Sequence, residues 1–277
     1  MKSYIIPQIL KYQNIDDLFV NNNKARSLSY AESNLSIDEL LKDDFVCIVG
    51  EPGIGKSRLL DEIKKHSSKK NIHSCKASEF KNEPISKNIE YYIIDALDEV
   101  EGDTFYSTLQ LIKDYKEKNT NSKVLFTCRK HYVASFKNHF ASCNDLIYVE
   151  LCRLRDEEVM EVVNKCSEIT KVNVANNSKL KELLTIPRYL TYFEEFEEKN
   201  GEISNIGELF EYMTSKSILK AIEARYNNSK NENFKILIQR VLEKVAFIME
   251  ISRKDQISKD ELYTILDGVK GLSLIHI

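Results

Sequence analysis

The stretch Gly50-Glu51-Pro52-Gly53-Ile54-Gly55-Lys56-Ser57 lies between the apolar run Phe45–Val49 and a segment with helical spacing. This pattern, placed between a strand and a helix, is typical of a phosphate-binding loop. Its glycines allow successive backbone NH groups to point at phosphate oxygens, and the start of the following helix adds its positive end. The sequence therefore predicts a nucleoside triphosphate site, with a chance glycine-rich turn as the alternative.

Two side chains of this loop have specific expected roles. Lys56 is placed to reach the β and γ phosphates as a point charge. The Ser57 hydroxyl is placed to ligate Mg²⁺, in a site completed by phosphate oxygens and water. The expected ligands are therefore ATP or ADP with Mg²⁺, and GTP is the alternative to ATP.

An acidic cluster follows the second apolar run, Tyr91–Ile94. Asp95 comes directly after this run, at the place of a Walker B aspartate, and is expected to hold Mg²⁺ directly or through water. Glu99 or Asp98 is expected to orient or deprotonate the attacking water. The alternative is that these acids only solvate the end of a strand.

A third polar cluster, Thr127-Cys128-Arg129, ends the apolar run Val124–Phe126. We expect Arg129 to sense the γ phosphate, because a guanidinium group presents a fork of donors that matches phosphate. Together with Asp98 and Glu99 it completes the set of candidate catalytic residues. A surface ion pair is the alternative for Arg129.

Apolar runs and amphipathic segments alternate through this part of the chain. Strands are expected at 45–49, 72–76, 91–94, 123–127 and 146–151, and helices after the phosphate-binding loop, at 105–116 and at 132–140. Such alternation predicts an α/β fold with a parallel sheet flanked by helices. In such sheets the functional groups gather at the carboxyl ends of the strands, where all three clusters fall.

Composition limits the class of protein. The 277 residues, of which 42% are hydrophobic, suffice for one large domain and smaller ones. No stretch reaches membrane-spanning length and no signal-peptide pattern opens the chain, so we expect a cytoplasmic protein without a membrane partner. A net charge of -3 with interspersed signs does not indicate nucleic acid as a partner. Six scattered cysteines without zinc spacing indicate reduced, mostly structural thiols.

Together the three clusters resemble the NACHT branch of the STAND class, signal-transducing P-loop ATPases related to AAA+ proteins. The resemblance rests on the loop 50–57, on Ala96 directly after the Walker B aspartate with two acids beyond it, and on the strand end at 126–129. Typical AAA+ ATPases have a glutamate where Ala96 stands, so the pattern favours NACHT. Arg58, which also belongs to the expected nucleotide-binding set, replaces a second hydroxyl residue that is often found there.

The resemblance also implies an order of domains. It comprises a leader at 1–35, a P-loop NTPase domain at 36–153, a small helical domain at 154–200 and a helical, partial winged-helix region at 201–271. Leu184–Leu190 resembles the segment whose proline packs near the nucleotide base, which makes Pro187 an expected adenine contact. The alternative is that Pro187 only ends one helix or opens the next.

The C-terminal region has two further patterns. Apolar residues at helical spacing predict helices at 206–224 and 237–251 with their stripes in a core, and Ser258–Glu261 has the form of a capping box before another helix. The last six residues, Leu272–Ile277, match one reading frame of a common sequencing adapter. We expect them to be a non-native tail on a C-terminally truncated chain.

Two functions follow from these patterns. The resemblance implies a slowly hydrolysing ATP switch in defence signalling, whose nucleotide state controls opening and self-oligomerisation, with unknown sensor and effector partners. The alternative is an AAA+-like motor or loader that remodels protein or nucleic acid with fast turnover.

Overall fold

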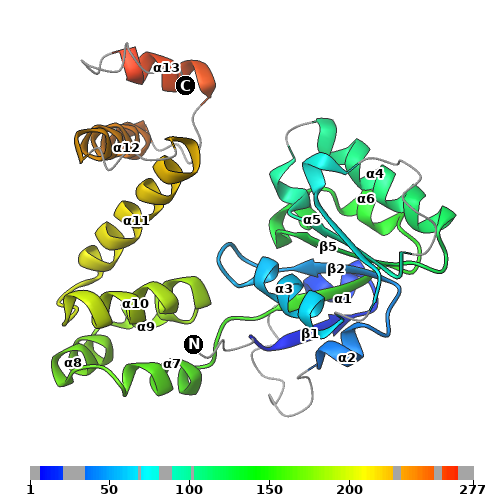
Figure 1. The fold of residues 1–277 in the computed structure, drawn as a ribbon, viewed down its shortest axis with the longest axis horizontal. Coiled ribbons are helices and arrows are strands. Elements are labelled where there is room, and N and C mark those ends of the chain that lie inside the picture. Colours follow the sequence, from blue (N-terminus) through cyan, green and yellow to red (C-terminus); the bar gives the residue numbers. More distant parts are fainter. Residues whose placement is uncertain are drawn as a thin grey trace. The chain divides into compact units, whose positions relative to one another are not determined.

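The computed structural model describes residues 7–20, 35–67, 70–80, 89–100, 103–226, 232–252 and 258–267 (Figure 1). The chain divides into two compact units. One consists of Met1–Cys166 and Val174–Thr191, and the other of Ser167–Asn173 and Tyr192–Ile277. Most of the expected leader and the whole expected tail, Leu272–Ile277, lie outside the described residues.

The first unit is built on a six-stranded sheet with the strand order β1-β6-β2-β5-β4-β3. The strands are β1 (Ile9–Tyr12), β2 (Phe45–Val49), β3 (Ile72–Lys76), β4 (Tyr91–Asp95), β5 (Lys123–Cys128) and β6 (Ile147–Leu151). Strands β2 to β6 run parallel to one another, which confirms the predicted α/β fold class. Strand β1 lies antiparallel to β6 at the edge, a pairing that the sequence did not predict.

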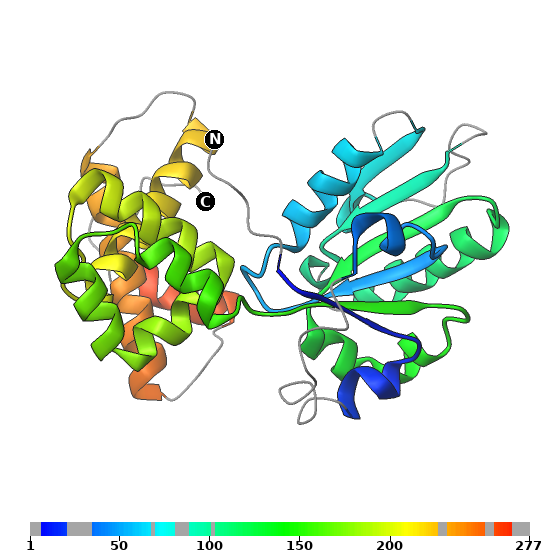
Figure 2. The same ribbon diagram turned by 90° about the horizontal axis from the view of Figure 1, so that it is seen from below.

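Helices cover both faces of this sheet (Figures 1 and 2). The helical elements of the first unit are α1 (Ile15–Val20), α2 (Ile37–Leu40), α3 (Lys56–His66), η1 (Ala77–Glu79), η2 (Leu97–Glu99), α4 (Asp103–Lys118), α5 (Lys130–Ser135), α6 (Lys137–Ala141), α7 (Asp156–Val163) and α9 (Ser178–Leu184). Side chains of α1, α4, α5 and α6 share one apolar cluster with Phe45, Cys47 and Val49. Side chains of α2 and α3 share the other with Val46 and Ile48. Because both faces are covered, every residue of β2 is buried.

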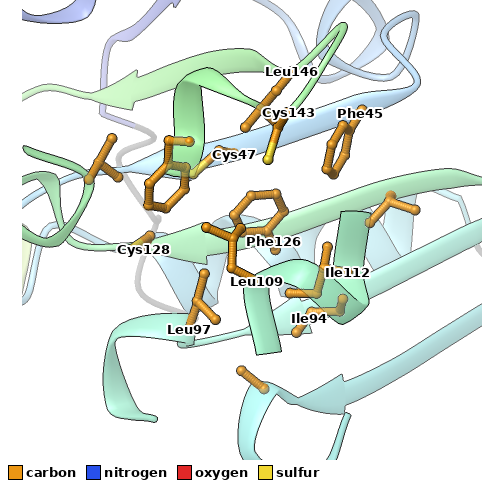
Figure 3. Packing of buried hydrophobic residues seen from close by; sticks show 14 of the residues in the cluster. Phe45, Cys47, Ile94, Leu97, Leu109, Ile112, Phe126, Cys128, Cys143 and Leu146 are labelled. Carbon is orange, nitrogen blue, oxygen red and sulfur yellow. The ribbon is translucent and has the colours of Figure 1, made fainter. Parts of the chain in front are cut away.

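Figure 3 shows the larger of these clusters, around Phe126 of β5. It contains three of the free thiols, Cys47, Cys128 and Cys143, and all three are buried. Burial raises the pKa of the Cys143 thiol to about 11, because a thiolate is poorly solvated there. These cysteines therefore pack as small apolar side chains, as the sequence predicts.

One expected helix is divided in two. The segment predicted as a single helix at 132–140 forms α5 and α6, which meet at Phe136 with φ -108° and ψ 28°. Phe136 turns inward here, and its ring stacks on Phe105 of α4 at a centroid distance of 4.4 Å. The packing of this aromatic pair accounts for the break.

The second unit contains only helices among its described residues. Helices α8 (Glu168–Asn176) and α10 (Pro187–Asn200) cross the boundary between the units, and α11 (Ile206–Tyr226), α12 (Glu232–Ser252) and α13 (Lys259–Asp267) follow. The carboxylate of Glu197 accepts hydrogen bonds from the Ser167 amide and the Thr170 hydroxyl, both at 2.9 Å, and so holds the start of α8. The predicted capping box is confirmed, since Ser258 and Glu261 exchange bonds of 2.8 and 3.2 Å.

The apolar stripe of α12 differs from the prediction. Leu209 and Ile218 of α11 are buried, as expected for core residues. On α12, however, Phe247 and Ile251 are 65% and 64% exposed, and none of the side chains described on this helix is buried. The core prediction is therefore wrong for α12, because the described part of the chain does not cover that face. Within the described ranges, no helix has both the length and the apolar character needed to cross a membrane.

Candidate functional site

The phosphate-binding loop connects β2 to α3, and its glycines adopt conformations that other residues avoid. Gly53 has φ 80° and Gly55 has φ 107°, both in the left-handed region. Gly55 is the N-cap of α3, so Lys56 and Ser57 form the first turn of that helix. The first backbone NH groups of a helix have no intrahelical partner, which makes this end a suitable anion site.

The side chain of Lys56 lies folded over the loop. Its Nζ donates to the carbonyl oxygen of Gly50 at 2.9 Å and to that of Glu51 at 3.2 Å. Burial lowers the pKa of Lys56 below its ordinary value of 10.5, while the charges of Asp98 and Asp95 act in the opposite direction. The ammonium group is thus held where phosphates would lie, within electrostatic reach of both acids.

The carboxylate of Asp95 is positioned by a buried hydroxyl. Ile94 of β4 pairs with Phe126 of β5, so Asp95 and Thr127 follow side by side on the two strands. The Thr127 hydroxyl donates to Asp95 Oδ1 at 2.5 Å and accepts from the Ala96 amide at 2.8 Å. Thr127 is fully buried. This arrangement fixes Asp95 at the carboxyl edge of the sheet.

Ala96, directly after Asp95, has an unusual backbone conformation. Its φ of 64° and ψ of 65° are left-handed, a conformation in which β-branched and bulky residues are genuine outliers. The turn leads directly into η2, which carries the two candidate acids. Glu99 is exposed, whereas Asp98 is buried.

Asp98 and Arg129, two of the candidate catalytic residues, form an ion pair. Arg129 Nε lies 2.7 Å from Asp98 Oδ2, and the side chains are 38% and 4% exposed. The other carboxylate oxygen, Asp98 Oδ1, is buried and has no hydrogen-bond partner among the described residues. Arg129 thus forms an ion pair, but with a buried acid of the predicted site and not with a surface partner, and its role toward the γ phosphate stays a prediction.

The loop between α9 and α10 contacts the phosphate-binding loop. The amide of Arg188 donates to the Gly53 carbonyl oxygen at 3.2 Å, and Pro187 occupies the first position of α10. Arg153, which follows β6, bridges two carboxylates: its NH2 lies 2.9 Å from Glu51, and its NH1 lies 3.3 Å from Glu182 of α9. The start of α10 is therefore adjacent to the phosphate-binding loop, and the adenine contact of Pro187 stays a prediction.

Three residues of this site were not assigned a role from sequence. Thr127 lies at the end of a predicted strand, and a hydroxyl residue between two apolar neighbours was a signal that could have indicated its role. Arg153 and Arg188 gave no such signal. Arg153 is 102 residues from its partner Glu51, and Arg188 is similarly far along the chain from Gly53. Only the fold brings these arginines to the loop.

The donor atoms at this edge fit a nucleotide with Mg²⁺. Ser57 supplies an exposed hydroxyl and Asp95 a carboxylate, and hard oxygen ligands of this kind suit Mg²⁺. The left-handed glycines, the helix start and Lys56 supply an anion site beside them. Ile54 is buried against the sheet, while Pro52 and Arg58 are exposed.

Solved structures with a similar chain course include the Holliday junction branch migration motor RuvB of Thermotoga maritima, with 16% identity, a TM-score of 0.41 and coverage of 95% of this chain and 87% of that one. The replication initiator DnaA bound to AMPPCP and single-stranded DNA has 10% identity, a TM-score of 0.41 and 86% coverage of both chains. The ORC1 protein of Aeropyrum pernix in complex with DNA has 10% identity, a TM-score of 0.37 and coverage of 81% and 76%. No functionally curated protein matches the chain.

The family comparison gives a direct assignment. The model of novel STAND NTPase 3 matches residues 30–178, which is more than half of the chain and includes all three polar clusters. This match confirms the STAND class, and the NACHT branch stays a prediction. The chain belongs to the novel STAND NTPase 3 family and is a STAND-type P-loop ATPase.

Proposed function

We propose that this protein is a nucleotide-dependent switch that binds ATP or ADP with Mg²⁺, hydrolyses ATP slowly and changes conformation with the nucleotide state. One observation carries the proposal: Arg129 is paired with the buried Asp98, within electrostatic reach of Lys56, at the edge where a γ phosphate would lie. A group that can distinguish ATP from ADP is what a switch requires.

Each residue of the site has its own proposed role. Lys56 binds the β and γ phosphates, and Ser57 and Asp95 hold Mg²⁺, which neutralises phosphate charge when bound. Thr127 keeps the Asp95 carboxylate in place through its 2.5 Å hydrogen bond. The attacking water is oriented by Glu99 or Asp98, the two acids of η2.

A route for conformational change also supports the switch. Arg188 and Arg153 connect Gly53 and Glu51 of the phosphate-binding loop to the α9–α10 region. Nucleotide that alters the loop would alter these contacts, and a ligand shifts an equilibrium by its differential affinity for the two states. We propose that opening exposes surfaces for self-association, and that Pro187 contacts the adenine base.

The second candidate is an AAA+-like motor with rapid turnover. The exposed position of Glu99 beside the Walker B aspartate favours it, since a carboxylate there is accessible to an attacking water. The named solved structures include a branch migration motor and two DNA-bound proteins, which makes nucleic acid a partner to test.

One set of measurements separates the two functions. Steady-state ATP hydrolysis would be measured with and without single- and double-stranded DNA, and mass by light scattering with ADP or a non-hydrolysable ATP analogue. The switch predicts turnover well below the 1 s⁻¹ at the low end of ordinary enzymes, together with a nucleotide-dependent change in mass or protease sensitivity. Rapid turnover that DNA stimulates, without such a change, would establish the motor.

We further propose the domain limits implied by the resemblance: a leader at 1–35, an NTPase domain at 36–153, a small helical domain at 154–200 and a partial winged-helix region at 201–271. The proposed setting is defence signalling in the cytoplasm, by analogy with the STAND class. Infection of cells that carry this gene, compared with infection of cells that carry its Lys56→Ala form, tests that setting.

A further inference from the structure

The Asp98–Arg129 pair joins a buried acid to a partly exposed arginine. The Asp98 side chain is only 4% exposed, and its Oδ2 lies 2.7 Å from Arg129 Nε in an ion pair. Its Oδ1 is buried without a partner among the described residues. A buried carboxylate is costly to keep charged unless a cation compensates it. Arg129 is therefore important to Asp98 as its counter-charge.

A second cation lies near this carboxylate but is already held elsewhere. Cys128 of β5 pairs with Val49 of β2, so Arg129 follows beside Gly50, where the phosphate-binding loop begins, and the charges of Asp98 and Arg129 both act on Lys56. The ammonium of Lys56, however, donates to two loop carbonyl oxygens and is not among the ion-pair partners of Asp98. Lys56 would meet the phosphates of ADP and of ATP alike, so it does not separate the two nucleotides.

We propose that Asp98 sets the preference between ATP and ADP by competing with the γ phosphate for Arg129. This inference rests on the proposed function, because it requires nucleotide at the phosphate-binding loop. Guanidinium binds carboxylate and phosphate alike, and a γ phosphate that takes the whole fork of Arg129 takes the Nε donor away from Asp98. ADP leaves the ion pair intact. ATP engages Arg129 only by drawing it from a buried carboxylate that is then left without its cation.

The pairing of Arg129 with Asp98 lowers the affinity for ATP relative to the affinity for ADP. The γ phosphate gains a bond to Arg129, but part of that gain offsets the loss of the Asp98 bond. The difference between the two nucleotides is therefore smaller than Arg129 alone would give. A neutral side chain of the same shape at position 98 releases Arg129 and raises the preference for ATP.

The test is a double-mutant cycle on nucleotide affinity. Mg²⁺–ADP and a Mg²⁺-bound non-hydrolysable ATP analogue would be titrated into the full chain, Asp98→Asn, Arg129→Gln and the double variant. Asp98→Asn is expected to raise the affinity ratio of the ATP analogue to ADP by about tenfold, within the usual range of coupling between sites. Arg129→Gln is expected to lower that ratio. The double variant is expected to behave as Arg129→Gln, because Asp98 acts through the arginine.

Two controls keep the outcomes distinct. Asp61→Asn removes the same charge from an exposed side chain of α3, paired with Lys64, and is expected to leave the ratio unchanged. Thermal melting establishes that each variant is folded, and Arg129→Lys, which keeps the charge but not the fork, replaces Arg129→Gln if that variant does not fold.

An unchanged or lowered ratio in folded Asp98→Asn would overturn the inference, as would a rise that persists in the double variant. Failure of the proposed function has a different signature. In that case the unmodified chain binds both nucleotides but has the same mass and protease sensitivity with both, while the affinity ratios of the variants are still measurable.

Discussion

The amide of Arg188 at the start of α10 donates a 3.2 Å hydrogen bond to the carbonyl oxygen of Gly53, which has φ 80°. A Cβ added to Gly53 would lie 3.0 Å from the Arg188 Cβ and 3.4 Å from Ile186 Cγ2. The glycine thus has two functions: it permits the left-handed turn of the phosphate-binding loop, and it lets the α9–α10 loop approach. This contact joins the predicted base-binding segment to the predicted phosphate site.

Gly53→Ala therefore tests the contact through stability. The left-handed conformation alone would cost about 1 kcal/mol of unfolding free energy, and the close approach to Arg188 would add to that. The matched control is Gly201→Ala, because Gly201 has φ 83° but no atom within 4 Å of its added Cβ. Chemical denaturation should show the larger loss for Gly53→Ala. Equal losses would mean that the Arg188 contact adjusts freely.

Lys56→Ala is expected to abolish detectable binding of ATP and ADP. The ammonium is held by two carbonyl oxygens of the loop, so its removal takes away the central charge of the anion site. Calorimetric titration measures the change, and Lys64→Ala, on the exposed side of α3, serves as the control. Retained affinity in folded Lys56→Ala would refute the assignment of the loop.

The lowered pKa of Lys56 predicts a pH dependence of nucleotide affinity. Burial lowers this pKa in the free protein, and bound phosphate would raise it again by adding negative charge. Binding should therefore take up protons, and affinity should decline as pH rises through the free-protein pKa, which lies below the 10.5 of an ordinary lysine. Titrations in buffers of different ionisation enthalpy would reveal this uptake. Proton release on binding in that range would contradict the assigned environment.

Thr127→Val should weaken the binding of Mg²⁺ more than it weakens the binding of the nucleotide itself. Valine has the same shape but leaves the Ala96 amide and Asp95 Oδ1 without the hydroxyl between them, at a cost of about 1–3 kcal/mol in stability. Nucleotide affinity would be measured across a Mg²⁺ series. Thr127→Ser, which keeps the hydroxyl, should restore the dependence. If valine and serine variants respond alike, Thr127 has only a packing role.

Glu99→Gln should leave ATP binding intact and slow hydrolysis by about 100-fold, if Glu99 orients the water. The prediction follows from its exposure, since its neighbour Asp98 is engaged with Arg129. Single-turnover hydrolysis measures the effect, and Glu62→Gln on α3 is a charge-matched control. Undiminished hydrolysis, together with its loss in Asp98→Asn, would assign the water to Asp98.

The sequence by itself determined the α/β class, the positions of strands β2 to β6 and the phosphate-binding loop. These depend on local signals: apolar runs for strands buried on both faces, and glycines where the backbone must take left-handed turns. The same local reasoning predicted the capping box at Ser258, because its two partners are three residues apart. It placed the two acids Asp98 and Glu99 after β4 but did not decide which of them orients the attacking water.

Only the tertiary structure decided which of these groups meet. The Asp98–Arg129 pair, the Thr127 bridge to Asp95 and the Arg188 contact with Gly53 all join residues that are far apart in the chain. The antiparallel edge strand β1 and the break at Phe136 likewise depend on β6 and on Phe105. Periodicity and motifs report what a segment needs from its immediate neighbours, whereas the identity of a distant partner is fixed by the packing of the whole sheet.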